Sequence, residues 1–162
     1  MNAMVQVTQD HHDAEERHDL PGGPSVLIAV DDTPGAWRTL RSGLAQAAAQ
    51  GADVTVLHVV PPRRWRVGRF APARAVPMHV VDPLESPVLQ EARRVALEHG
   101  IHPRLELIAA DDADTVILGM ARRIGAATIV VGGSRPESRV APLGVCQGVL
   151  RRAPVPVVVV PA

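Results

Sequence analysis

A glycine-rich turn near the end of this 162-residue chain is its clearest candidate for ligand chemistry. The turn spans residues 132–136, reads Gly-Gly-Ser-Arg-Pro, and directly follows the apolar run Ala127–Val131. In α/β proteins, a glycine turn between a buried strand and a helix holds phosphate groups, because free backbone N–H groups and the helix dipole face outward there. The alternative is a tight structural turn, since two glycines alone are a weak motif.

A carboxylate is the second candidate. Asp31 ends the apolar run Ser25–Val30, and ligands of parallel sheets bind at the carboxyl ends of strands. A carboxylate at such a place is suited to sugar hydroxyls or a metal ion. The alternative is that Asp31 or Asp32 only caps the turn into the next helix, which is a common role of aspartate. The sequence leaves both interpretations open.

Other reactive side chains have simpler structural interpretations. For His58, which lies in an apolar segment, a hydrogen bond to the backbone is favoured over a pH switch. Cys146 lies beside valines at helical spacing, which indicates packing rather than redox sensing. The arginines around Trp65 and Phe70 form a basic, aromatic patch, either a partner surface or a solvated loop. The histidines of the first 20 residues lack the spacing of a metal site.

The composition argues against several classes of function, among them binding of nucleic acid or membranes. The 17 basic and 17 acidic residues cancel, so no overall charge attracts nucleic acid or an anionic membrane. The single cysteine excludes an intrachain disulfide and fits a cytoplasmic location. No apolar run reaches the roughly 20 residues of a membrane span. Because no nucleophile–base arrangement, paired carboxylates or metal motif is visible, we expect no enzymatic activity.

Apolar runs and helical patterns alternate along the chain and would position these residues. Strands are expected at 25–30, 53–60, 105–109, 127–131 and 155–160, with helices between most of them and a last helix ending at Arg152. Thr33 is expected to cap the first helix, with Pro34 at its first position. Such units predict a parallel sheet that is covered on both faces. Residues 1–24 are interpreted as a disordered tail, residues 25–162 as one domain, and residues 61–83 as a long connection.

Four segments in the right order resemble the universal stress protein family. They are residues 26–31, 51–59, 124–132 and 149–159, and the likeness covers about residues 25–161. The resemblance implies an α/β fold with a five-stranded parallel sheet sandwiched by helices, of the flavodoxin-like or adenine nucleotide alpha hydrolase-like kind. It also implies dimers that form through the last strand.

The family's ATP-binding motif is degenerate in this chain. Members that bind ATP carry Gly-x-x-Gly, nine residues, and then Gly followed by Ser or Thr. Here Arg135 or Pro136 stands at the second glycine position, depending on which glycine begins the motif. Gly144 comes one or two residues too early, and Val145 after it has no hydroxyl. Together these departures predict impaired or absent ATP binding.

The nucleoside-binding part of the family pattern is closer to this sequence than the phosphate-binding part. Asp31 and Val59 match positions that hold ribose and adenine in family members that bind ATP. The resulting candidate pocket contains Asp31, Val59, Gly132, Gly133, Ser134 and Gly144. We expect a non-enzymatic, cytoplasmic stress-response regulator without a cofactor or metal. It would dimerise through Val155–Val160 and bind a regulatory protein, but no nucleic acid or membrane. The alternative is an adenine-nucleotide (ATP or AMP) switch or weak ATPase, and a nucleotide hydrolase ranks last.

Overall fold

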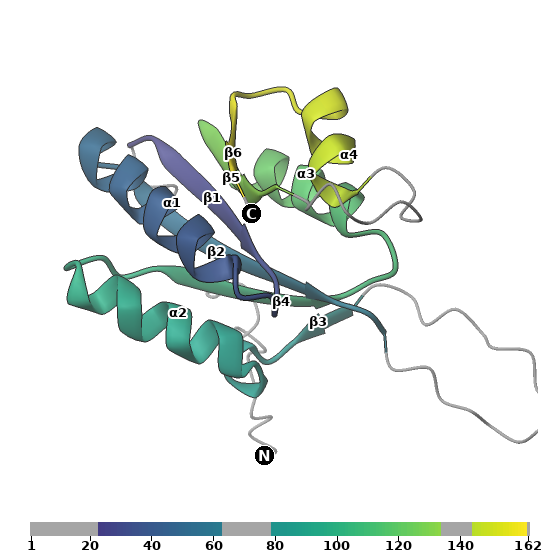
Figure 1. Ribbon diagram of the computed structural model, residues 1–162, viewed down its shortest axis with the longest axis horizontal. Helices are drawn as coiled ribbons and strands as arrows, with labels where there is room; N and C mark the ends of the chain where they lie inside the picture. The colour runs from purple at the N-terminus through teal and green to yellow at the C-terminus, as the bar shows by residue number, and fades with distance from the viewer. Residues whose placement is uncertain (1–22, 63–78, 134–143, 162) are drawn as a thin grey trace, which may run out of the picture.

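The structure is a computed structural model that describes residues 23–62, 79–133 and 144–161 (Figure 1). Several predictions from the sequence fall outside these ranges. They concern most of the N-terminal tail with its histidines, the arginine-rich patch around Trp65 and Phe70, Ser134, and the Arg135 and Pro136 positions of the glycine turn.

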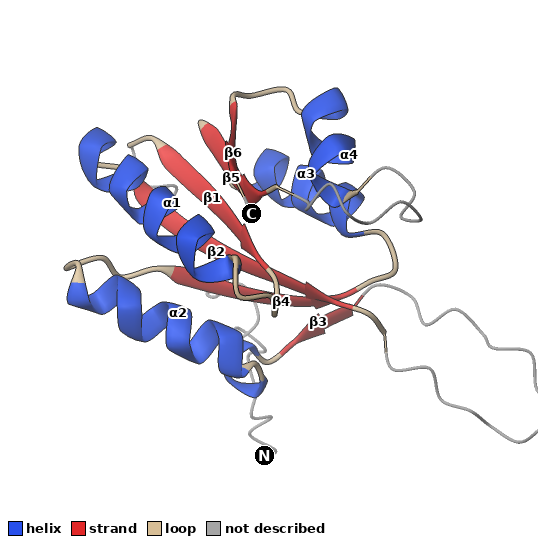
Figure 2. Ribbon diagram, in the orientation of Figure 1, coloured by secondary structure: helices blue, strands red, loops and turns tan. Residues whose placement is uncertain are grey.

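Strands and helices alternate along most of the described chain (Figure 2). The elements are β1 (Ser25–Val30), α1 (Ala36–Gln50), β2 (Asp53–Val60), β3 (His79–Val81), a 3-10 turn η1 (Pro83–Glu85), α2 (Pro87–Glu98), β4 (Arg104–Ala109), α3 (Ala113–Arg123), β5 (Thr128–Gly132), α4 (Val145–Arg152) and β6 (Val157–Val160). Among the described residues, no helix combines the length and apolar character that a membrane span needs.

Six strands form one sheet in the order β3-β4-β2-β1-β5-β6. The five strands other than β3 are parallel, and β3 pairs antiparallel with β4 at one edge. The predicted five-stranded parallel sheet is therefore confirmed, with one short added strand. Counted along the chain, the parallel strands lie in the order 3-2-1-4-5, as in dinucleotide-binding sheets, whereas flavodoxin has 2-1-3-4-5. The order reverses between β1 and β5, where such sheets bind ligands.

Helices cover both faces of the sheet, as the apolar strands predicted. α1 and α2 lie on one face, and α3 and α4 lie on the other (Figure 1). Successive residues of β1 alternate between the two cores: Val26 and Ile28 pack toward α1 and α2, whereas Leu27 packs toward α3. A strand with both faces buried needs apolar residues at every position, which explains the unbroken run.

Two local predictions are corrected. Helix α1 begins at Ala36 with Gly35 as its N-cap, not at Pro34 with Thr33 as the cap. The Thr33 hydroxyl donates to Asp31 Oδ1 at 2.6 Å, so it is not placed to cap the helix. The second correction concerns β3, which lies inside the segment interpreted as a connection. Helix α2 is capped by Ser86, whose hydroxyl accepts from the Leu89 N–H at 3.2 Å.

Candidate functional site

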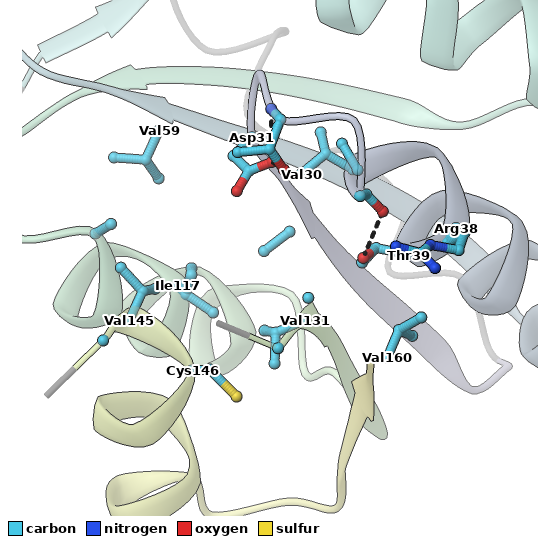
Figure 3. Close-up of a pocket in the computed structure, with 18 of the residues that line it drawn as sticks. Val30, Asp31, Arg38, Thr39, Val59, Ile117, Val131, Val145, Cys146 and Val160 are labelled. Atoms are coloured by element: carbon cyan, nitrogen blue, oxygen red, sulfur yellow. Dashed lines mark hydrogen bonds between the residues drawn. The ribbon is translucent and has the colours of Figure 1, made fainter. Parts of the chain in front are cut away.

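A cavity of about 680 Å³ opens at the carboxyl edge of the sheet, where the strand order reverses. The ends of β1, β2, β5 and β6 form its floor, and the first turns of α1, α3 and α4 surround it (Figure 3). Its volume lies within the range of about 300–1,000 Å³ that is typical of small-molecule sites. The topology thus provides a ligand-sized pocket at the place where the sequence predicted one.

The two ends of the pocket differ in chemistry. Val59 of β2, Ile117 of α3 and Val145 of α4 lie at one end, where they offer an apolar surface. Arg38 and Thr39 of α1 lie at the opposite end, as Figure 3 shows. A ligand that spans the pocket would therefore place its apolar part and its polar part at separate ends.

Asp31 is the one carboxylate among the described residues that line the pocket. Its Oδ1 accepts hydrogen bonds from the Thr33 N–H at 3.0 Å and from the Thr33 hydroxyl at 2.6 Å. These two bonds fix the carboxylate at the end of β1. They also show that Asp31 organises the turn before α1, which is one of the two roles considered from the sequence. The same carboxylate also borders the pocket, and its contact with a ligand stays a prediction.

The two glycines at the end of β5, Gly132 and Gly133, do not form an open phosphate cradle in the described part of the turn. The Gly133 N–H donates to the Val160 carbonyl at 2.7 Å, so β6 already uses this amide. Gly132 lies close to α1: a Cβ at this position would lie 3.0 Å from Thr39 Oγ1. Neither glycine has a positive φ. In the described part of the turn, both glycines lie in close packing at the sheet edge.

Helix α4 closes the pocket opposite β1. Gly144 is its N-cap and provides no side-chain hydrogen bond to the first turn. Val145 is 44% exposed beside the cavity, so an apolar surface stands where the family motif has a hydroxyl. Cys146 is buried against the pocket, and burial raises the pKa of its thiol, which keeps the thiol protonated and weakly nucleophilic.

His58 is buried one residue before Val59 and supports the pocket from outside it. Its Nδ1 lies 3.0 Å from Ser86 Oγ, the hydroxyl that caps α2. The partner is thus a side chain and not the backbone group expected from the sequence. Burial lowers the pKa of His58, and the negative charges of Asp32 and Asp31 oppose this shift only in part.

Five of the six predicted site residues meet at this one cavity, and Ser134 lies outside the described residues. The five are Asp31, Val59, Gly132, Gly133 and Gly144. Sequence reasoning missed Arg38, Thr39 and Ile117, and it interpreted Cys146 only as packing. Their positions in the sequence could have identified them. A helix that follows a parallel strand begins at the sheet edge where that strand ends, so residues near its start lie beside the pocket.

The comparison with known families decides the family of the chain. The model of the universal stress protein family matches residues 24–161. The chain belongs to the universal stress protein family. None of the curated proteins matches the sequence.

Solved structures of universal stress proteins share this fold. The protein from Archaeoglobus fulgidus is 23% identical, with a TM-score of 0.61, covering 84% of this chain and 92% of its own. A structure of the Archaeoglobus fulgidus protein in complex with dAMP is 23% identical, with a TM-score of 0.57 and coverages of 85% and 96%. A universal stress protein in complex with cAMP is 21% identical, with a TM-score of 0.60 and the same coverages.

Proposed function

We propose that this universal stress protein is a non-enzymatic regulatory domain that binds an adenine nucleoside or nucleoside monophosphate and holds ATP weakly or not at all. One observation carries the proposal. The pocket at the strand-order reversal keeps Asp31 and an apolar wall, whereas the Gly133 amide beside it is already hydrogen-bonded to β6. The nucleoside end of a binding site is present, and part of the backbone that would cradle phosphates is occupied.

The nucleoside end is supported by complementary chemistry. A purine ring is flat and largely apolar, which suits the surface of Val59 and Ile117. Ribose hydroxyls are donors, and the fixed carboxylate of Asp31 is an acceptor at the rim of the same cavity. Two structural relatives were solved with dAMP and with cAMP, and each of these ligands carries a single phosphate.

Both the sequence and the packing support the loss of a binding site for the triphosphate. The motif that ATP-binding members carry needs a glycine where this chain has Arg135 or Pro136, and proline has no N–H to donate. The loop to Gly144 is one or two residues shorter than the motif. Val145 offers methyl groups and no hydroxyl. Each change removes a hydrogen-bond donor or the backbone freedom to present one.

Three further parts of the proposal rest mainly on the sequence. The absence of enzymatic activity follows from the absence of a recognisable catalytic arrangement in the sequence. A cytoplasmic location stays a prediction from the single cysteine. Dimerisation and binding of a regulatory partner are proposed for β6, which is an edge strand of the sheet that the described residues form.

Calorimetric titration with adenosine, AMP and ATP, the last with Mg²⁺, tests this function. We expect adenosine and AMP to bind measurably, and ATP to bind no more tightly than AMP because its β- and γ-phosphates gain no additional contacts. Micromolar ATP affinity well above that of AMP would favour the alternative, an ATP-dependent switch or weak ATPase. The size of the pocket is the observation in favour of that alternative. No heat of binding with any of the three would contradict both.

A further inference from the structure

We propose that Arg38 and Thr39, on the first turn of α1, bind the single phosphate group of a nucleoside monophosphate in place of the glycine loop. This inference rests on the proposed nucleoside site. It identifies Arg38 and Thr39 as the side chains that would favour a nucleoside monophosphate over a nucleoside. It assigns the phosphate to two side chains of α1 instead of the backbone of residues 132–145.

Arg38 brings a positive charge to the pocket, which suits a phosphate group. Arg38 is the one basic residue among the described residues that line the pocket, and the pocket's one carboxylate there is Asp31. Within the described ranges, the ion pairs involve Arg94, Arg123 and Arg152, and none involves Arg38. An arginine that borders a cavity and forms no ion pair with a described residue can present its N–H donors to a ligand, and phosphate oxygens match the geometry of those donors.

Thr39 provides an independent second observation. Its side chain lines the same end of the pocket and is only 2% exposed. Its hydroxyl donates to the Gly35 carbonyl at 3.4 Å, far beyond the usual O–H···O distance of about 2.7–2.8 Å. A buried hydroxyl with such a weak partner can rotate to donate to a phosphate oxygen instead. The missing Cβ of Gly132 leaves this hydroxyl room beside the end of β5.

Three backbone amides of the first turn of α1 are already hydrogen-bonded. The N–H groups of Ala36, Arg38 and Thr39 already donate to carbonyls of the preceding turn. The phosphate would therefore be held by the two side chains. An arginine fork and one hydroxyl match the oxygens of one phosphate group, the number that a nucleoside monophosphate carries.

The geometry of the pocket agrees with this arrangement. Val59 and Ile117 lie at one end, and Arg38 and Thr39 lie at the other (Figure 3). A base on the apolar end and a sugar beside Asp31 would direct a 5′-phosphate toward α1. The ligand class is thus a nucleoside monophosphate, which has an apolar ring at one end and a phosphomonoester at the other.

The test compares AMP and adenosine, because they differ only in the phosphate. Both are titrated by calorimetry into the wild-type chain and into Arg38→Gln, Arg38→Lys and Thr39→Val. Arg41→Gln is the matched control, since Arg41 is an exposed arginine of the same helix that does not line the pocket. Arg38 is exposed, so its variants should fold, and circular dichroism checks this for each protein.

We expect Arg38→Gln to weaken AMP binding by about tenfold or more, the usual weight of a charge-assisted hydrogen bond, and to leave adenosine binding unchanged. Arg38→Lys should recover part of the loss, Thr39→Val should show a smaller loss, and Arg41→Gln should show none. Equal losses for AMP and adenosine, equal losses in Arg38→Gln and Arg41→Gln, or unchanged AMP binding in Arg38→Gln would each overturn the inference. If adenosine binds and Arg38 has no effect, only this inference fails. If the wild-type chain binds neither ligand, the proposed function fails with it.

Discussion

At the residue scale, the site is shaped by side chains that serve structure and pocket together. Asp31 organises the turn before α1 through Thr33 and still borders the cavity. Gly132 makes room for Thr39, and the Gly133 amide is used by β6. The sequence therefore predicted that Asp31, Gly132 and Gly133 lie at the edge of the sheet. It did not predict the Thr33, Thr39 and Val160 groups that they contact there.

His58 gives a prediction for the pH dependence of stability. Burial lowers its pKa in the folded chain, so the unfolded chain takes up this proton first as the pH falls. Its contribution to the free energy of unfolding is therefore complete above the unfolded pKa of about 6.5 and is lost as the pH drops toward the folded pKa. Below pH 6.5, wild-type stability should fall more steeply than that of His58→Gln, by at most about 1.4 kcal/mol per pH unit.

Urea unfolding between pH 5 and 8 measures this difference. The matched control is His102→Gln, which replaces an exposed histidine outside the pocket and should keep the wild-type slope. The slope is the informative quantity, because losing the contact with Ser86 lowers the stability of His58→Gln at every pH. Parallel curves for the wild type and His58→Gln would show that the burial of His58 has no such effect.

At the element scale, the sequence predicted most of the parallel sheet because the central strands β1, β2 and β5 are short, mostly apolar runs that are largely buried. Such a pattern needs no tertiary information. β3 was missed because its three residues follow a segment rich in proline and arginine and are too few to show a period. The start of α1 was misplaced because Thr33 is a good capping residue whose hydroxyl is used by Asp31. Arg38 and Thr39 were missed because a pocket wall is a tertiary feature.

The packing of α1 on β1 gives a prediction at this scale. Both Gly43 on α1 and Gly119 on α3 are helical glycines, and replacing either with alanine gains about 1 kcal/mol of helix propensity. A Cβ at Gly43 would lie 2.5 Å from Ile28 Cδ1, inside the core, whereas nothing lies within 4 Å of a Cβ at Gly119. We expect Gly119→Ala to stabilise the chain by up to about 1 kcal/mol and Gly43→Ala to destabilise it, because overpacking costs about 1–3 kcal/mol.

Urea unfolding of the two variants and the wild type measures both effects, and each variant serves as the other's control. A Gly43→Ala variant at least as stable as Gly119→Ala would mean that Ile28 gives way without strain, and that α1 is less closely fixed on β1 than the structure indicates. The position of α1 matters for function because its first turn carries Arg38 and Thr39.

At the scale of the whole molecule, the two sheet edges differ in what they offer a partner. β3 is a three-residue antiparallel strand at one edge, and β6 is a run of four valines at the other. An apolar edge strand pairs readily with another chain unless it is covered or charged. The proposed dimer therefore uses β6, whose last residue, Val160, also lines the cavity.

A charge on this edge should prevent dimerisation. Val159 is 37% exposed, and Val159→Lys places an ammonium group on the strand that we propose to pair. At tens of micromolar, size-exclusion chromatography with light scattering should give twice the 17.2 kDa of one chain for the wild type and a single chain for Val159→Lys. Leu84→Lys, at an exposed position on η1, is the control and should remain dimeric. A monomeric wild type would contradict the proposed dimer.

The most direct test of the central claim is a crystal structure of the chain grown with ATP and Mg²⁺. The claim is that the pocket binds the nucleoside part of the ligand but no longer has a binding site for three phosphates. We predict ordered density for adenosine between Val59 and Asp31 and for the first phosphate near Arg38, with no ordered density for the last two. Three ordered phosphates bound by the backbone of residues 132–145 would contradict the claim.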